Sequence, residues 1–548
     1  MPSRILWGAI AFRLIVFHYG KSLVNIYDAK DQYLPFLKYL NLYYRELLRN
    51  LLRGGFYLKM FDYSLGFGMD PIRALSYYGL ADPLSLPVVF FRQTNILPYY
   101  QFIVQFRPFL AGVSFIGMCF HFRKINYTVP FCALFYLCSG WALYASSVHP
   151  FFINFLILLP MTIAGIDKIL YRKSSALFIV SVFLAGGIGF YFLFMVSSTM
   201  LIFAIVRLIC RRREILCIRK KNAQSTSDSL PDKKQESPDD GSNRRYSEDS
   251  AASMAAEAVK IVLKSLGFYL IGLAMSCFIL LPSLLGVMDS LRGASSNLLE
   301  NMFVYPFPTL EKLYSRAVLI SPSCDSLGFS AIGLFCIVAA LSKRRKDETG
   351  VLALIGIILW FSPAWSVFMS GIALPNYRWF FALSLLIMYL CTDITEYCDK
   401  ASLLQMIIFV IAGAAAIAAS FADYQSGTSF SIIRMLTCAV GMVLLILSRK
   451  HFGKSVRRAA CIVLICIQCI VNTVAFLSPL WFDKVHEYTD RNVEKRIDHS
   501  PFAIIKNDPD YDPLYRTVLG GGNVYNTASV LQIPSPHTYA SIIPESVS

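Results

Sequence analysis

The chain is organised around a long polar stretch near its start. Residues 25–82 read NIYDAKDQYLPFLKYLNLYYRELLRNLLRGGFYLKMFDYSLGFGMDPIRALSYYGLAD, between a first apolar run and a long series of further apolar runs. Asp28 and Asp31 stand three residues apart directly after the first run, where a helix that crosses a bilayer would leave the hydrocarbon. We therefore expect this stretch to carry chemistry at a membrane surface.

The composition is typical of a polytopic membrane protein. Hydrophobic residues make up 56% of the 548 residues, and the mean hydropathy is +0.53, far above that of a soluble chain. The apolar residues fall in runs of about 17 to 25, long enough to cross a bilayer as helix. The net charge of +16 arises in short loops between these runs, so it indicates membrane topology and not nucleic-acid binding.

Hydropathy predicts an all-α fold with about thirteen transmembrane helices. Basic loops stay in the cytoplasm, and their alternation along the chain places the N-terminus inside and the C-terminus outside in a multi-pass cell-membrane protein. Residues 20–95 and 282–325 then form outer loops. The predicted spans are 5–19, 96–120, 128–148, 151–166, 176–194, 196–210, 258–281, 326–342, 350–371, 378–392, 402–421, 431–448 and 458–478.

The chain divides into two predicted domains. Residues 1–479 form the transmembrane domain, with the outer loop 20–95 and a cytoplasmic loop 211–257 that we expect to be disordered, because its polar part lacks hydrophobic periodicity. Beyond residue 480, short β-type runs such as Leu514–Leu519 are separated by Gly, Pro and Asn. Residues 480–548 are therefore predicted to begin a β-rich extracytoplasmic module.

An amphipathic helix is predicted within the first outer loop. Polar and cationic residues recur every three or four positions from Lys38 to Arg53, and leucines fill the opposite side. The cationic face either guides an anionic lipid headgroup into a site or merely covers neighbouring helices. The apolar segment 83–91 is too short to span and contains two prolines, so we expect it to be re-entrant or interfacial.

Short motifs occur along the chain in a characteristic order and spacing. They are Asp28-x-x-x-Gln32-Tyr33, Gly66-x-Gly68, Ser76-Tyr77-Tyr78, Asp82-Pro83, Pro375-Asn376-Tyr377-Arg378-Trp379, Tyr515-Arg516, Asn526 and Ser535-x-x-x-Tyr539-x-Ser541. Together, over nearly the whole chain, they resemble the YfhO family of bacterial membrane proteins, which is placed among the GT-C-type glycosyltransferases. Members of that family usually continue for some hundreds of residues more, so we expect this chain to be truncated in its outer domain.

The resemblance implies a glycosyltransferase that acts on the outer face of the cell membrane. The donor would be a polyprenyl-phosphate-linked sugar, and the acceptor a cell-envelope polymer such as a teichoic or lipoteichoic acid. This chemistry needs a carboxylate to deprotonate or orient the acceptor hydroxyl. Asp28 matches the family position by its spacing to Gln32 and is the predicted base, with Asp31 on the same helical face as the alternative. A helix cap or a solvated loop acid is the structural alternative for Asp28.

The resemblance also implies substrate-binding residues. A cation must hold the departing lipid phosphate, and Arg378, at the start of a predicted span, either does this or anchors the helix end. Gln32 either hydrogen-bonds the sugar or fixes Asp28. Aromatic side chains near the outer surface are candidates for stacking on sugar rings, although such residues are common in any membrane protein. These aromatic candidates are Tyr33, Tyr77 and Tyr78.

Two further polar residues lie within or beside predicted spans. Arg107 falls inside the second span, where a charge costs about 2.5–3.5 kcal/mol on insertion scales, so it should face a partner or a cavity: it forms a buried salt bridge or contacts substrate. His149, before Pro150 at an outer helix end, either carries a proton or has no role. No His, Asp or Glu cluster outside the membrane has metal-ligand spacing, so we expect no cofactor, although Asp28 with Asp31 can still offer oxygens to a divalent cation.

Two other classes of function stay open. A transporter or flippase for lipid-linked precursors would also be polytopic, but no inverted repeat is evident and few ionisable residues lie near the midplane. A noncatalytic scaffold in envelope assembly is favoured by the expected truncation. The long outer loop directly after the first span favours the transferase, with membrane lipids, a polyprenyl-phosphate-linked sugar and a teichoic-type polymer as partners and no nucleic acid.

Overall fold

The structure is a computed structural model that describes most of the chain. It describes residues 12–66, 68–212, 214–215, 249–288, 305–343, 347–371, 376–422, 428–451, 453–493, 501–512, 517 and 526–535. The start of the span predicted at 5–19, most of the loop 211–257 and most of the β-type run Leu514–Leu519 lie outside these residues. So do the motif residues Pro375, Tyr515, Arg516, Tyr539 and Ser541.

Helices dominate, but fewer of them than expected can cross a membrane. Within the described residues, six helices are long and apolar enough, or nine spans result if each of three bent helix pairs counts as one. The prediction of about thirteen spans is therefore wrong. The six are α4 (Ile96–His121), α7 (Ile153–Leu170), α9 (Phe190–Cys210), α11 (Asp249–Met288), α18 (Leu403–Ala422) and α20 (Lys454–Leu477).

The remaining apolar runs are broken or short. The bent pairs are α5 with α6 (Val129–Leu137, Gly140–Val148), α14 with α15 (Glu348–Trp360, Pro363–Met369) and α16 with α17 (Phe380–Cys391, Ile394–Lys400). Ser139 and Ser362 accept hydrogen bonds from the first turns of α6 and α15, so each begins a new helix inside one apolar run. Window hydropathy counts apolar residues and does not detect such caps. The described helices α8 (Ala176–Ile188) and α13 (Ser330–Leu341) are also too short to count.

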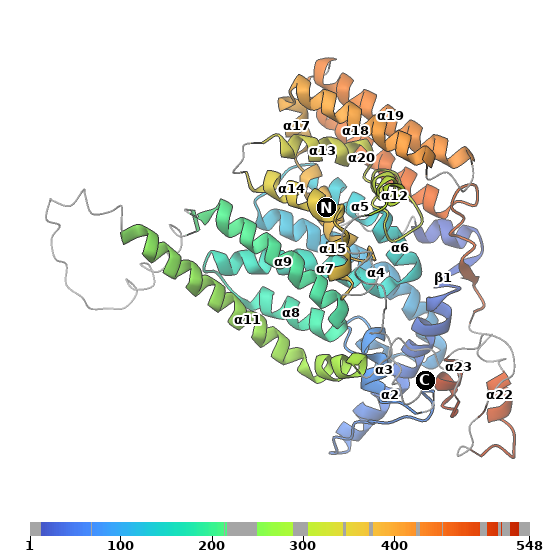
Figure 1. Ribbon diagram of the computed structural model, residues 1–548. Coiled ribbons are helices and arrows are strands. Elements are labelled where there is room, and N and C mark those ends of the chain that lie inside the picture. Colours follow the sequence, from blue (N-terminus) through green and yellow to red (C-terminus); the bar gives the residue numbers. More distant parts are fainter. Residues whose placement is uncertain are drawn as a thin grey trace.

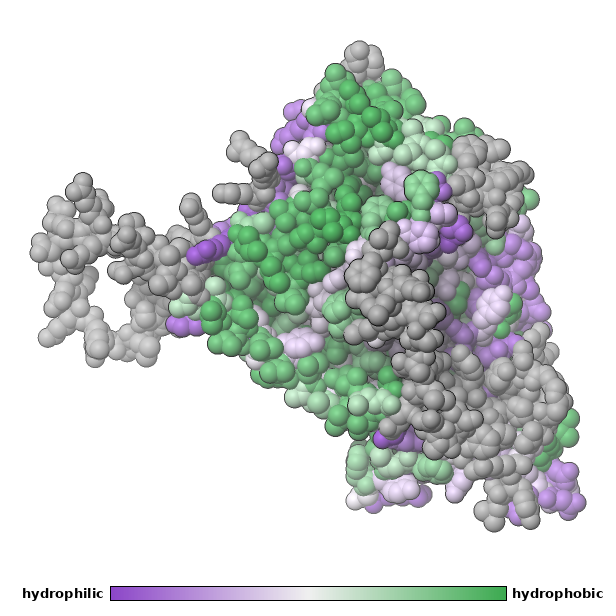
Figure 2. Space-filling model, viewed as in Figure 1, coloured by the Kyte–Doolittle hydropathy of each residue, from purple (hydrophilic) through white to green (hydrophobic). Residues whose placement is uncertain are grey.

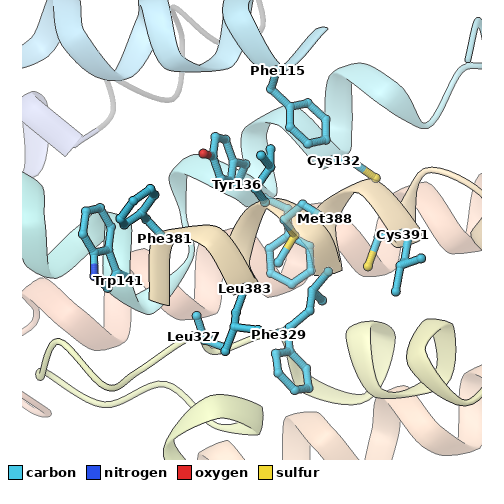
Figure 3. Packing of buried hydrophobic residues seen from close by; sticks show 14 of the residues in the cluster. Phe115, Cys132, Tyr136, Trp141, Leu327, Phe329, Phe381, Leu383, Met388 and Cys391 are labelled. Carbon is cyan, nitrogen blue, oxygen red and sulfur yellow. The ribbon is translucent and has the colours of Figure 1, made fainter. Parts of the chain in front are cut away.

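Helix α7 lies in the middle of the bundle and packs against α4, α8, α9 and α16 (Figure 1). Gly165 permits the approach of α8, because a Cβ atom there would lie 2.8 Å from the backbone N and Cα of Phe178. A second part of the core, drawn in Figure 3, joins α5, α6 and α16 through Trp141 and Phe381, whose ring centroids are 5.5 Å apart. Figure 2 shows hydrophobic residues covering much of the bundle on the face in view.

Four helices begin at one end of the bundle, which we call the site end, and finish at the other, which we call the far end. These helices are α4, α7, α9 and α16. Ion pairs join three of them, α4, α7 and α9, at the far end: His121 Nε2 lies 2.7 Å from Asp167 Oδ2, and Arg207 Nε lies 2.8 Å from Asp167 Oδ1. Arg207 also pairs with Glu348 at the start of α14. These ion pairs thus connect α4, α7, α9 and α14 at the far end of the bundle.

The first polar loop folds against the site end. Helix α2 (Leu34–Leu52) is amphipathic, as the spacing predicts, and the first part of its polar side faces protein, whereas Arg49 and Arg53 are exposed. Asn41 is fully buried and donates to the carbonyls of Val88 and Phe91, and Arg45 also donates to Phe91. The segment expected to be re-entrant or interfacial forms a short 3₁₀ helix, Leu86–Phe90, which packs on α2.

In its described residues, the C-terminal segment is not β-rich. Its described part contains one strand, β2 (Tyr488–Asp490), which pairs antiparallel with β1 (Lys21–Asn25) from the start of the chain. Ser22 Oγ lies 2.7 Å from Thr489 Oγ1, and Lys21 Nζ lies 2.8 Å from Asp490 Oδ1. The short helices α22 (Pro501–Lys506) and α23 (Thr527–Leu531) follow, and α23 packs on α2 (Figure 1). Gly and Pro residues interrupt short helices as well as strands, and this explains why a β-rich module was wrongly predicted here.

Candidate active site

The candidate site begins where β1 gives way to a single turn of π-helix, Ala29–Tyr33, with Asp28 at its N-terminal boundary. The turn is closed by the backbone N–H of Leu34, which donates to the carbonyl of Ala29 five residues earlier. A π-turn widens the helix, so side chains four and five residues apart lie on one side. This geometry brings Gln32 and Tyr33 to the same side as Asp28.

The Asp28 carboxylate is held by two neighbours. Gln32 Nε2 donates to Asp28 Oδ1 at 2.6 Å, and His149 Nδ1 lies 3.0 Å from Asp28 Oδ2. His149 comes from the junction between α6 and the short 3₁₀ turn Pro150–Phe152, and its ring stacks on Phe152 with centroids 4.5 Å apart. The Asp28 side chain keeps 30% of its surface exposed, so one side of the carboxylate is open to a reactant.

Tyr33 shares the same imidazole nitrogen. Its hydroxyl lies 2.8 Å from His149 Nδ1. An ionised carboxylate only accepts hydrogen bonds, so its contact with Nδ1 requires the His149 tautomer that carries a proton on Nδ1, and in this tautomer the Tyr33 oxygen is a second acceptor. Burial, with the nearby Asp28 charge, raises the pKa of Tyr33 well above its usual value, so the phenol stays neutral. Asp28, His149 and Tyr33 therefore form one connected polar group.

Aromatic rings enclose this group. The Tyr33 ring lies 5.0 Å from the ring of Phe151 and 6.0 Å from that of Tyr78, between centroids, and Tyr78 in turn packs against Tyr77. Tyr78 is almost fully buried. The structure thus brings the three predicted tyrosines together, with Tyr33 and Tyr78 as part of the wall around His149.

Arg378 reaches the same place from the start of α16. Its guanidinium lies 5.5 Å from the centroid of the Phe152 ring and 5.7 Å from that of Tyr191, and Tyr33 and Tyr77 are among its electrostatic neighbours. Tyr144 lies close enough to interact with the charges of both Arg378 and Asp28. No carboxylate of the described residues forms an ion pair with Arg378. The site therefore combines a carboxylate and a cation that are not paired with each other.

Asp31 points into a different environment. Its carboxylate lies 3.4 Å from Lys30 Nζ, and its backbone carbonyl accepts a hydrogen bond from Asn526 Nδ2 at 2.6 Å. Burial raises the pKa of Asp31, and the Asp28 charge adds to this effect against the opposing charge of Lys30. In the described part of the chain, no three His, Cys, Asp or Glu side chains form a group with metal-binding geometry.

Arg107 lies outside the group around Asp28. It is fully buried, and its Nη2 lies 2.6 Å from Asp82 Oδ2, while its Nε donates to Asn154 at 3.1 Å. Asn154 also donates to Asp82, which gives the carboxylate a second partner. The Arg107 guanidinium covers the Phe151 ring at 4.3 Å, so this buried ion pair supports one wall of the site without entering it.

Sequence reasoning missed several residues that shape the site. Tyr144, Tyr191 and Phe152 surround Arg378 or His149, and Asn376 donates to the Tyr191 hydroxyl at 2.6 Å. Aromatic residues at helix ends are too common in membrane proteins for their spacing to give a signal. The sequence did contain a signal for Asp82. An arginine buried within a span requires an acidic partner, and Asp82 ends the first polar stretch.

Comparison with known proteins gives one match. A family model described as "Bacterial membrane protein YfhO" matches residues 3–548 of the chain. No curated protein and no solved structure matches it.

Proposed function

The chain belongs to the YfhO family of bacterial membrane proteins, and from this premise we propose that it is a membrane glycosyltransferase. In this proposal it transfers a sugar from a polyprenyl-phosphate-linked donor to a hydroxyl of a teichoic-type polymer. The site end of the bundle faces the outside of the cell, with the N-terminus of the chain in the cytoplasm and the C-terminal segment outside.

One observation carries the proposal: a partly exposed carboxylate, Asp28, and the cation Arg378 belong to the same aromatic-walled site without pairing with each other. Glycosyl transfer from a lipid phosphate needs both charges. A carboxylate accepts the proton of the acceptor hydroxyl, and a cation stabilises the phosphate that departs. Aromatic walls suit a sugar ring, whose C–H faces are apolar.

The chemistry follows from these placements. The acceptor oxygen bonds to the anomeric carbon, the bond from that carbon to the phosphate oxygen breaks, and its electron pair leaves with the lipid phosphate. Asp28 takes the hydroxyl proton. The N–H of His149 and the amide of Gln32 hold the Asp28 carboxylate in place before the reaction, which limits the reorganisation that proton transfer requires. Arg378 neutralises the charge that develops on the phosphate.

The test is the sugar content of purified teichoic acids, measured by mass spectrometry in a strain that lacks the gene and is complemented at matched membrane levels. Asp28→Asn keeps the shape and removes the base, so we expect at least a 100-fold loss of transfer. Asp31→Asn is the matched control, because its carboxylate pairs with Lys30, and we expect it to restore glycosylation. Full restoration by Asp28→Asn would remove Asp28 as the base, and a loss with Asp31→Asn alone would move that role to Asp31.

The variant His149→Gln tests which residue of the Asp28–His149 pair is the base. If Asp28 is the base and His149 orients it, the glutamine amide replaces the N–H donor, and we expect a loss of about tenfold or less. If His149 were the base and Asp28 only fixed its tautomer, His149→Gln would be at least as damaging as Asp28→Asn. The comparison of the two transfer rates in purified protein decides between them.

A further inference from the structure

An apolar cavity of about 110 Å³ opens between α9, α14, α15 and α16. Its lining is almost entirely hydrophobic, with Trp365 and Trp379 towards the site end and Glu348 and Tyr389 towards the far end. Along α16, ten residues separate Trp379 from Tyr389, which corresponds to about 15 Å of helix. The cavity therefore runs through about half of a hydrocarbon core that is roughly 30 Å thick.

Two chain segments connect the candidate active site with the lining of the cavity. Trp379, in its lining, directly follows Arg378 in the chain. Helix α9 makes the same connection, because Tyr191 in its first turn lies against the Arg378 guanidinium and Thr199 and Phe203 further along line the cavity. Two helices thus lead from the arginine into the apolar space.

Side chains at both ends of the cavity lining have partners of their own. Trp379 Nε1 donates to Ser366 Oγ at 3.2 Å, and its ring meets that of Trp365 edge to face at 6.2 Å. At the other end, Glu348 is paired with Arg207. A guest that enters this cavity is therefore apolar along its length and carries any polar group at the site end.

We propose that the cavity holds the first isoprene units of the polyprenyl chain, with the phosphate of the same molecule at Arg378. This rests on the proposed function and adds the site for the lipid. Polyprenyl phosphate has an anionic head and a single apolar tail. The head matches Arg378, which has no carboxylate partner in the described residues, and the tail matches the apolar cavity. A phospholipid offers two tails and a head larger than a bare phosphate, so it matches this arrangement less well.

The test uses the purified full chain in nanodiscs and a polyprenyl monophosphate with a diazirine on its chain near the phosphate. After irradiation, we expect labelled peptides from α9, α14 and α16. Ala382 lines the cavity, and Ala382→Phe should lower labelling at least fivefold and raise the KM for the lipid-linked donor with little change in kcat. Ala415→Phe, at an exposed position on α18, adds the same side chain elsewhere and should leave both unchanged.

A second variant keeps the test valid if Ala382→Phe does not fold. Arg378→Gln should lower labelling by the polyprenyl phosphate but not by the corresponding uncharged polyprenol, because only the phosphate needs the cation. Unlabelled polyprenyl phosphate should compete with the probe, and phosphatidylglycerol should not. Equal competition by phosphatidylglycerol, or labelling that neither variant reduces, would overturn the proposal.

The same experiment distinguishes a failure of the lipid site from a failure of the proposed function. Labelling measures binding and needs no sugar transfer. Wild-type labelling in the cavity without any transfer activity would leave the lipid site in place and contradict the transferase. Sugar transfer that depends on Asp28, combined with labelling outside the cavity, would support the transferase and contradict the lipid site.

Discussion

At the scale of single residues, the position of Asp28 depends on the π-turn that follows it. The sequence left open whether Gln32 hydrogen-bonds the sugar or fixes Asp28, and the structure places Gln32 Nε2 2.6 Å from Asp28 Oδ1. The contact with His149 was not predictable, because 121 positions separate the two residues and only the folded bundle brings α6 to the turn. The sequence thus offers a local contact as one of two alternatives, and it does not show the distant contact with His149.

Gln32→Glu tests the electrostatics of this contact. The substitution replaces an amide donor with a second carboxylate next to Asp28, and two carboxylates in contact raise the pKa of at least one. We expect the acidic limb of the pH–rate profile for sugar transfer to move upward by at least about one pH unit. Gln32→Leu, which removes the hydrogen bond without adding charge, should lower the rate with a smaller shift. Identical profiles for wild type and Gln32→Glu would show that Asp28 does not titrate in the rate-limiting step.

Arg107 shows what composition alone cannot decide. A charge within a predicted span needs a partner. The sequence did not show whether the partner of Arg107 is a substrate or an acidic side chain. The structure places Asp82 at 2.6 Å in a fully buried pair. The Asp82-Pro83 motif thus acquires a structural role behind the site, not one in it.

At the scale of elements, the closeness of helices depends on small residues. Gly165 lies where α7 crosses α8, and a Cβ atom there would meet backbone, which cannot rotate away. We expect Gly165→Ala to lower the stability in detergent by about 1–3 kcal/mol, the usual cost of overpacking. Gly117→Ala is the matched control on α4, since its site is exposed and nothing lies within 4 Å of the added Cβ.

Thermal unfolding of the two purified variants checks this prediction. Alanine favours an exposed helix over glycine by up to about 1 kcal/mol, so the melting temperature of Gly117→Ala should stay the same or rise. Equal melting temperatures for the two variants would mean that α7 and α8 tolerate a wider separation.

Helix α2 shows why periodicity gives an element but not its orientation. The pattern predicted an amphipathic helix correctly, and the polar face was expected to face lipid headgroups or to cover helices. Asn41 and Arg45 agree with the second alternative, because they donate to carbonyls of the short 3₁₀ helix beside α2 and of Phe91 after it. Leu51 and Leu52 are exposed. Only the packing of the neighbouring loop shows which face is buried.

At the scale of the whole molecule, the proposed orientation can be tested directly. Leu480, after α20 at the site end, is 83% exposed, and the Lys400 side chain, at the end of α17, is 75% exposed. We expect a membrane-impermeant maleimide to label Leu480→Cys in intact cells and to label Lys400→Cys only after permeabilisation. The unmodified chain gives the background from its own cysteines. The opposite pattern would place the site in the cytoplasm and contradict transfer outside the cell.

Composition was sufficient to predict a mainly helical membrane protein, and the motifs were sufficient to predict the family that the comparison confirms. The number of spans was not predictable by hydropathy, because serine caps and bends divide apolar runs without making them more polar. The C-terminal segment was misjudged because its strand pairs with the start of the chain and not with its own neighbours.

The pairing of β1 with β2 has a consequence for how the protein is made. Ser22 and Thr489 meet although 467 positions separate them, and Asn526, later still, contacts the Asp31 carbonyl. At about 5–20 residues per second, a ribosome needs roughly 20 to 90 s to travel that distance. During this interval the loop that carries Asp28 is already synthesised but still lacks its partner strand. The loop that carries Asp28 is thus among the first parts of the chain to be made, but it receives its contacts with β2 and Asn526 only when the chain is almost complete.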